Sequence, residues 1–418
     1  MAIVKPFRAV RPTRDKVSLV TTRSYDIYTK KELKSILDIN PFSFLHILRP
    51  GFKYNKRVTG KKRFKMVYNR FVEFKENNIF TSDNEPFFYL HEKKYGHQTF
   101  WGIIALSSLA DYKGDVIKKH EKTLKNREEL FGNYLNITGF NAEPVLITYP
   151  DNDLITTIYN NYKLRRSEYE FTTNKRRTHQ LWLIDRKEDI LAIKNEFDKM
   201  DSVYIADGHH RTASSLFLAD KLNKEQNTSI KDSKLHNFFM SYLIPESNLN
   251  ISSFNRFVRT LNNLSKEEFL MQLDMRFRIE NLGVKLYKPT KKHHFSMYLD
   301  GEFYKLYLRK TGYRINNALE DLDSQILYKT VLDPILGIND LTNDDKISYK
   351  PEILDPTQIK SEVDSGKYEV GFGLFPISIG QLKLVADNNL TMPPKSTYIE
   401  PKLRTGLTIF ELNGAQNI

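Results

Sequence analysis

The chain has 418 residues, of which 40% are hydrophobic and 12% aromatic, and its formal net charge at pH 7 is +13. This composition is typical of a globular protein of one large or two ordinary domains and excludes a wholly disordered chain. The chain contains no cysteine, which excludes disulfides, thiolate catalysis and cysteine-bound zinc. It shows neither a signal peptide nor about 18 continuous apolar residues, so we expect a cytoplasmic protein without a membrane partner.

The positive charge is concentrated at the N-terminus. Residues 1–80 hold 19 Lys and Arg against 6 Asp and Glu, an excess equal to the net charge of the whole chain. Such a region can attract nucleic acid or an anionic small substrate. The densest run, residues 61–65, is explained more simply as a solvated helix face, and no helix-turn-helix or zinc-finger signature accompanies it.

The apolar pattern predicts strands and helices in turn over the first 245 residues. Helices are expected at residues 32–37, 61–77, 119–133, 187–199 and from 209 onward. Strands are expected at residues 44–48, 87–91, 99–105, 144–149, 181–184, 203–206 and 238–244.

A second region is expected from about Asn248. It contains predicted helices at residues 266–273, 322–332 and 379–386, a strand at 370–375, and a hairpin of residues 294–299 and 302–308 around Asp300-Gly301. The sequence therefore predicts an α+β fold with mixed sheets. We place the site in residues 1–245 and expect residues 246–418 to form a second α+β region that contributes a C-terminal loop to it.

The most informative motif is the run Asp207-Gly208-His209-His210-Arg211, which joins a predicted strand to a predicted helix. Glycine permits a tight turn, and the first turn of a helix presents N–H groups that attract anions. Two imidazoles and a guanidinium add donors suited to phosphate. The alternative is that Asp207 only caps the helix and the other side chains are solvated.

Two other polar clusters are candidates. His120 and Glu121, at the start of the helix expected at 119–133, can supply a general base and its partner, or can be an exposed helix start. Pro393-Pro394 fixes a loop that presents three possible phosphate ligands, Lys395, Ser396 and Thr397. His179 precedes a predicted strand and is more often structural. No Gly-rich lysine loop is present, so a P-loop nucleotide site is not expected.

Residues 204–211 closely resemble the signature of a widespread bacterial and archaeal family labelled a domain of unknown function. The resemblance extends over nearly the whole chain, through Pro6-Phe7-Arg8-Ala9, Tyr25-Asp26, Phe44-Leu45-His46-Ile47, Gly102-Ile103-Ile104, residues 117–123, His179-Gln180-Leu181-Trp182, residues 332–337 and residues 392–397.

The Asp-Gly-His-His-Arg signature also resembles that of free serine kinases of the ParB/sulfiredoxin-like superfamily. That resemblance implies phosphoryl transfer from ATP or ADP to free L-serine, giving O-phosphoserine, with Mg²⁺ bridging the phosphates. It implies a ParB/sulfiredoxin-like strand–turn–helix that binds nucleotide phosphate and a glutamate that activates the serine hydroxyl. The resemblance carries over directly to Asp207, His209, His210 and Arg211, and Glu121 is the best match for the glutamate. We therefore expect catalysis by Glu121, Asp207 and His120, metal binding by Asp207, and phosphate binding by Gly208, His209, His210 and Arg211.

Arg8 and His179 are the candidates for binding the substrate. Three other functions remain open at this point: a ParB-like nucleotide-dependent DNA-binding protein or nuclease, a metal-dependent phosphoester hydrolase, and a non-catalytic nucleotide-binding regulator. The oligomeric state is not predicted.

Overall fold

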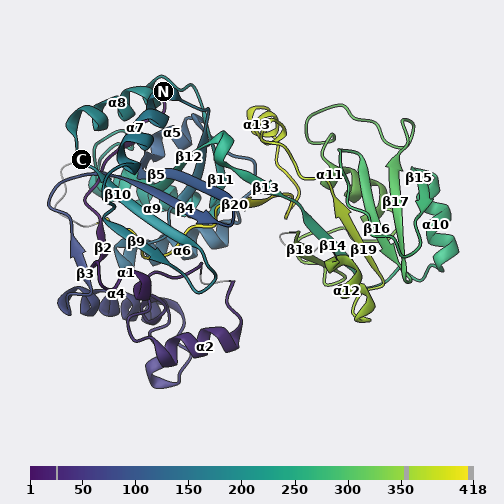
Figure 1. Ribbon diagram of the computed structural model, residues 1–418, viewed down its shortest axis with the longest axis horizontal. Coiled ribbons are helices and arrows are strands. Elements are labelled where there is room, and N and C mark those ends of the chain that lie inside the picture. Colours follow the sequence, from purple (N-terminus) through teal and green to yellow (C-terminus); the bar gives the residue numbers. More distant parts are fainter. Residues whose placement is uncertain (25–26, 353–356, 413–418) are drawn as a thin grey trace. The chain divides into compact units, whose positions relative to one another are not determined.

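The computed structural model describes residues 1–24, 27–352 and 357–412 (Figure 1). The chain divides into two compact units. The first comprises Met1–Lys118, Thr123–Leu249 and Pro401–Ile418, and the second comprises Lys119–Lys122 and Asn250–Glu400. The C-terminal segment therefore returns to the first unit. The dipeptide Tyr25-Asp26, which contributes to the family resemblance, lies outside the described residues.

The first unit is built on a nine-stranded mixed sheet. The pairs β6–β11 and β8–β12 are parallel and the other pairs are antiparallel. Its strand order is β6 (Ile117–Lys118), β11 (Val203–Asp207), β8 (Val145–Tyr149), β12 (Phe238–Pro245), β5 (Gln98–Ser108), β4 (Phe88–Tyr95), β10 (Thr178–Ile184) and β9 (Tyr169–Thr172), with β1 (Val4–Lys5) paired to β5.

The two faces of this sheet differ in character. Side chains alternate between the faces along each strand. One face carries Phe88, Leu90, Trp101, Ile103 and Val145, which form the main core with α7 (Asp153–Lys163) and α8 (Lys187–Asp198). The other face carries polar side chains, among them His91, Lys93 and His179, all of which are buried. The apolar face stabilises the unit, whereas the polar face requires partners for its buried groups.

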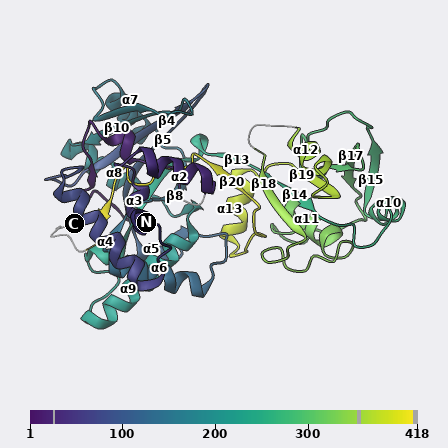
Figure 2. The same cartoon turned by 90° about the horizontal axis from the view of Figure 1, so that it is seen from below.

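Helices also pack around α9 (His209–Gln226), the helix that follows the Asp207–Arg211 motif. α6 (Lys125–Thr138) lies beside α9, and α5 (Leu109–Lys113) contacts it as well (Figures 1 and 2). α9 itself contacts β8 and β12 and thus packs against the sheet.

The N-terminal segment forms a separate small core. Phe44, Phe71, Phe80, Phe140 and Ile409 belong to it, so the C-terminal segment helps to bury the N-terminal helices. Its elements are α1 (Val17–Val20), α2 (Lys30–Ile39), α3 (Leu45–Leu48), α4 (Gly60–Glu76), the pair β2 (Val10–Pro12) and β3 (Phe80–Ser82), and the pair β7 (Phe140–Asn141) and β21 (Phe410–Glu411).

The second unit contains a six-stranded antiparallel sheet with apolar cores on both faces. Its order is β15 (Phe277–Asn281), β17 (Glu302–Leu308), β16 (His294–Leu299), β19 (Val370–Leu374), β14 (Phe254–Val258) and β18 (Ile347–Pro351). The remaining elements are α10 (Lys266–Asp274), α11 (Asp323–Leu327) with a π-helical turn at Tyr328–Leu332, α12 (Gln358–Asp364), α13 (Ile379–Asp387), and the pair β13 (Asn250–Ser252) and β20 (Tyr398–Glu400). The expected α+β class with mixed sheets is confirmed.

Two sequence-based assignments were wrong. Residues 44–48 form the helix α3 and not a strand. Phe44, Leu45 and Ile47 are all buried, and a short apolar run buried on several sides carries no periodicity that separates strand from helix. The helix expected at 119–133 begins only at Lys125, because Ile117 and Lys118 pair with β11 and the chain after them is irregular, with a bend at Glu121. His120 and Glu121 therefore precede that helix.

His179 was expected before a strand but lies inside β10, where it pairs with Lys93 of β4 and Phe171 of β9. Among the described residues, no helix combines the length and the apolar character needed to cross a membrane.

Candidate functional site

The Asp207–Arg211 motif forms a strand–turn–helix, as the sequence predicts. β11 ends at Asp207 and α9 begins at His209. Gly208 between them has φ 109°, and no side chain caps the helix from that position. A Cβ on residue 208 would lie 2.8 Å from Nη2 of Arg211. Glycine therefore suits the backbone angle, and a Cβ at this position would displace the guanidinium of Arg211.

A bulge in β11 directs Asp207 away from the main core. The pairing register with β8 shifts between Ile205 and Asp207. Without the shift, Asp207 would share the face of Ile205, which is part of the apolar core. An extra residue re-aims the side chains that follow it. The bulge therefore explains how a carboxylate can follow a core strand without entering the core.

Two cations hold the carboxylate of Asp207. Nζ of Lys402 lies 3.0 Å from Oδ2 of Asp207, and Nη2 of Arg211 lies 3.9 Å from the same oxygen. Burial would raise the pKa of Asp207, but Lys402 and Arg211 outweigh burial and hold the pKa below its usual range. The carboxylate is therefore ionised at neutral pH and suits a role as ligand or acceptor, not as an acid.

Arg211 is itself held by a second carboxylate. Its Nη1 donates to Oε1 of Glu143, which precedes β8. The guanidinium thus lies between Glu143 and Asp207, at the start of α9. An anion that enters this turn meets the positive end of the helix dipole and would compete with these carboxylates for Arg211.

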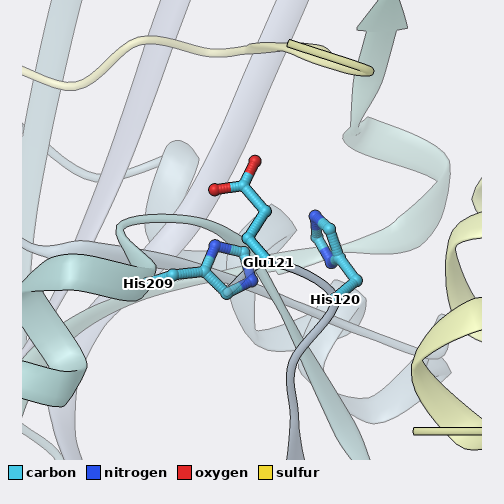
Figure 3. Close-up of side chains that lie close together, drawn as sticks. All are labelled: His120, Glu121 and His209. Atoms are coloured by element: carbon cyan, nitrogen blue, oxygen red, sulfur yellow. The ribbon is translucent and has the colours of Figure 1, made fainter. Parts of the chain in front are cut away.

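His209 lies close to His120 and Glu121. One ligand atom from each of the three residues lies within 4.8 Å of the others (Figure 3). His120 and His209 are buried, whereas Glu121 is exposed. His120 and Glu121 lie in the short segment of residues 119–122. Lys118 before this segment pairs with Tyr204 of β11, and Thr123 after it belongs to the first unit, so the first unit holds both ends of the segment. Two imidazoles and one carboxylate are ligands suited to a transition metal, whereas Mg²⁺ prefers oxygen.

The two substrate-binding candidates lie apart from this turn in the sequence. Arg8 lies between Phe7, whose N–H donates to Phe87 O at 3.0 Å, and Ala9, whose N–H donates to the Tyr89 hydroxyl at 2.8 Å. His179 lies on the polar face of the sheet, and its Nδ1 is 3.1 Å from Nε2 of His91. Their roles stay predictions.

The proline-fixed loop belongs to the second unit. Lys395 accepts a hydrogen bond from Arg256 at its backbone oxygen, and its ammonium lies 5.5 Å from the centre of the Phe254 ring. The hydroxyl of Ser396 lies 2.9 Å from that of Ser324. Thr397 directly precedes β20. These contacts explain the order of the loop, and its contribution to phosphate binding stays a prediction.

Sequence reasoning missed two residues of the turn. Glu143 is 68 residues before Arg211, and Lys402 is 195 residues after Asp207. A carboxylate directly before a buried strand and a lysine near the C-terminus carry no local signal, because only the strand order and the returning C-terminal segment bring them to the turn.

A search of the curated proteins finds no match. Among solved structures, the chain is similar to SbnI with a C-terminal truncation from Staphylococcus aureus, at 13% identity and a TM-score of 0.40, covering 75% of this chain and 90% of that one. It is also similar to a free serine kinase in complex with AMP, at 10% identity and a TM-score of 0.36, covering 73% of this chain and 91% of that one. A conserved hypothetical protein from Pyrococcus furiosus has 11% identity and a TM-score of 0.35, with 73% of this chain and 95% of that one covered.

One family model covers most of the chain. It matches residues 4–325, a range that includes the Asp207–Arg211 turn, Glu143 and the nine-stranded sheet but not Lys402. By this match the chain belongs to the family described as protein of unknown function, DUF1015.

Proposed function

We propose that the chain is a nucleotide-dependent phosphotransferase that phosphorylates the hydroxyl of free L-serine to give O-phosphoserine, with ATP or ADP as donor. The observation that carries the proposal is the turn at Asp207–Arg211, where a helix N-terminus, Arg211 and Lys402 surround one ionised carboxylate. The resemblance of this signature to that of free serine kinases supplies the nucleotide and the acceptor.

Phosphoryl transfer requires mainly positioning and neutralisation of charge. In the proposal, the backbone of Gly208 and the first turn of α9 hold the donor phosphates, with His209, His210 and Arg211 as side-chain donors. Phosphate oxygens then replace the carboxylates of Glu143 and Asp207 as acceptors for the Arg211 guanidinium. Lys402 lies beside Asp207 and adds positive charge at the same point.

Mg²⁺ binds to proteins through one or two carboxylates together with substrate phosphates. Asp207 fits that role, because its carboxylate is ionised and lies at the phosphate turn. Bound there, the ion would neutralise charge on the transferred group. Glu121 is the proposed general base for the serine hydroxyl, with His120 beside it to orient it. The exposed position of Glu121 leaves its carboxylate accessible to a substrate.

The direct test is to incubate the protein with Mg²⁺, L-serine and either ATP or ADP, and to look for O-phosphoserine by mass spectrometry. A pool of other amino acids and alcohols identifies a different acceptor. If phosphate is released without any phosphorylated product, the protein is a hydrolase. If nucleotide binds without turnover, it is a regulator.

Glu121→Gln separates the base from the binding site. We expect it to lower kcat by about 10²–10⁴-fold while nucleotide affinity stays the same, because charge at the phosphates is unaltered. Near-normal turnover in this variant would place the base elsewhere.

Gly208→Ala tests the turn, with Gly96→Ala as its matched control. Both glycines have positive φ, but a Cβ at Gly96 meets no atom within 4 Å, whereas a Cβ at Gly208 meets Arg211. Both variants carry the backbone penalty, and only Gly208→Ala displaces the guanidinium. We therefore expect nucleotide affinity to fall in Gly208→Ala and to be retained in Gly96→Ala.

A nucleotide-dependent DNA-binding protein is the second candidate. The observation in its favour is the exposed, basic start of α4, where Lys61, Lys62 and Lys65 all face solvent. A DNA affinity that falls steeply with salt and responds to nucleotide would support it.

A further inference from the structure

Positively charged side chains gather on the polar face of the first unit's sheet. They lie near β4 and β10, which β8, β12 and β5 separate from β11 and the Asp207 turn. We call the residues Lys93, Arg177, His179 and Arg404 the basic cluster. Lys93 and His179 are paired across β4 and β10, Arg177 directly precedes β10, and Arg404 comes from the C-terminal segment. Lys93 and His179 are each 2% exposed. His179 interacts electrostatically with Arg404, Lys93 and Arg177, so side chains from three separate parts of the sequence lie near one another.

Arg404 is held there by neutral groups. Its Nε donates to Oγ1 of Thr21 at 2.9 Å, and its Nη2 donates to the backbone oxygen of Thr21. The guanidinium carbon lies 5.7 Å from the centre of the Phe171 ring. Burial, together with the neighbouring Arg23 and Arg177, lowers the pKa of Arg404 to about 10 against the opposing effect of Tyr28. The side chain is therefore fixed in place, and no carboxylate among the described residues compensates its charge.

Arg177 has an unsatisfied donor. Its Nε is buried and has no hydrogen-bond partner among the residues that the structure describes. The guanidinium carbon lies 5.0 Å from the centre of the Tyr95 ring, a contact that does not satisfy the Nε–H donor. Within the described ranges, neither Arg177 nor Arg404 forms an ion pair with a carboxylate. Buried donors of this kind are normally satisfied, so each one requires an explanation.

His179 completes the cluster as an acceptor. The Tyr242 hydroxyl donates to the backbone oxygen of His91 at 3.2 Å, so the 3.3 Å contact with His91 Nδ1 requires that nitrogen to donate. A neutral His91 then accepts at Nε2 and His179 must donate from Nδ1, across 3.1 Å. Burial, with help from His91 and Arg404, holds the pKa of His179 well below its usual range, so it is neutral. Its Nε2 therefore carries a lone pair.

Two guanidinium groups beside a neutral imidazole acceptor are complementary to a molecule that has both an anionic group and a hydrogen-bond donor. We propose that Arg177 and Arg404 bind the carboxylate of the hydroxyl-bearing acceptor and that Nε2 of His179 accepts a hydrogen bond from its ammonium or hydroxyl group. The inference rests on the proposed function and defines its substrate class as small hydroxy or amino acids, not uncharged alcohols.

The cluster is connected to the Asp207 turn through one short segment. Nζ of Lys93 donates to the backbone oxygen of Lys402 at 3.4 Å, and the side chain of Lys402 reaches Asp207. The same four-residue stretch, residues 401–404, supplies Arg404 to the cluster and Lys402 to the turn. An acceptor held by the cluster would thus be positioned by the same backbone that orders the proposed phosphate site.

Kinetics with paired substrates tests the carboxylate contact. L-serine and serinol both carry the hydroxyl, but serinol has no carboxylate. Removing one charge-assisted hydrogen bond should cost about 1.5–3 kcal/mol, which is roughly a 10–150-fold change. We expect Arg177→Gln to lower kcat/KM for L-serine by such a factor while serinol turnover and nucleotide KM stay unchanged. Arg177→Lys should recover part of the loss. The control Arg166→Gln removes an exposed arginine and should change nothing.

Direct binding distinguishes failure of this inference from failure of the proposed function. Calorimetric titration with L-serine and with inorganic phosphate is made on the full chain and on Arg177→Gln. If Arg177→Gln loses L-serine binding but the wild type shows no turnover, the carboxylate site is supported and the kinase proposal fails. If the wild type turns over L-serine and Arg177→Gln does so equally well, the kinase proposal is supported and the carboxylate site fails. Equal losses for L-serine and serinol, or loss of phosphate binding alone, would overturn the carboxylate site.

Discussion

The first unit buries arginines in two opposite ways. Arg11 pairs through Nη2 with Asp83 at 2.7 Å and through Nη1 with Glu168 at 2.8 Å, and Nη1 also donates to the Tyr169 hydroxyl at 2.7 Å. Although burial acts in the other direction, these partners raise the pKa of Arg11 above its usual range. Burial and cationic neighbours lower the pKa of Arg404. A buried charge that the fold neutralises is structural. Arg404 has no carboxylate partner among the described residues, and this difference motivates the proposed acceptor site.

The strongest test of this contrast is Arg11→Gln. The substitution leaves Asp83, whose side chain is 5% exposed, without its cation. Breaking a buried pair in this way costs about 3–5 kcal/mol. We expect urea denaturation to show a loss of that size. Arg14→Gln is the control, because Arg14 is 52% exposed and shares Glu168. It should cost less than about 1 kcal/mol. Equal losses would mean that Arg11 is not the central residue of its cluster.

Tyr89→Phe tests the same neutralised cluster with a smaller change. The Tyr89 hydroxyl accepts from the Ala9 N–H at 2.8 Å and lies 2.8 Å from Oδ2 of Asp83. Its removal leaves buried polar groups without a partner, at a cost of about 1–3 kcal/mol. Thermal unfolding should show the loss, while Tyr54→Phe, at a residue 57% exposed, should be neutral. A neutral Tyr89→Phe would show that water replaces the hydroxyl.

The histidines of the polar face make stability depend on pH. Burial lowers the pKa of His91 to about 3, and the pKa of His179 is lowered as well. The unfolded chain takes up these protons near pH 6.5, so below that pH it binds more protons than the folded chain. The free energy of unfolding should therefore fall as pH falls from about 6.5, by up to about 1.4 kcal/mol per pH unit for each histidine.

Urea denaturation at pH 7, 6 and 5 measures this slope. His179→Gln should reduce the slope by the amount that one histidine contributes. His97→Gln, which removes an exposed histidine, is the control and should retain the wild-type slope. An unchanged slope in His179→Gln would mean that His179 takes up its proton over the same pH range in the folded and the unfolded chain.

The smallest expected effect belongs to Arg177→Gln. Its side chain contributes the contact with the Tyr95 ring and no ion pair among the described residues. We expect the free energy of unfolding to change by less than about 0.5 kcal/mol, the usual range for positions without a structural partner. A loss of stability as large as that of Arg11→Gln would mean that Arg177, like Arg11, has a structural role, and the two arginines would no longer differ.

Much of the fold was predictable where the signal is local. The β16–β17 hairpin follows from Asp300-Gly301, which both have positive φ in the structure. The long helices α4 and α9 follow from their apolar spacing. By contrast, α3 was expected as a strand, because burial on several sides removes the periodicity on which the assignment depends.

The sequence by itself determined the Asp207–Gly208–His209–His210–Arg211 turn, since a strand, a glycine with positive φ and a helix start are all encoded within ten residues. Only the tertiary structure decided what surrounds it. Glu143 reaches Arg211 through the order of the strands, and Lys402 and Arg404 arrive because the chain returns to the first unit at Pro401. Such pairings depend on which strands are neighbours, and one local stretch of sequence contains no information about that.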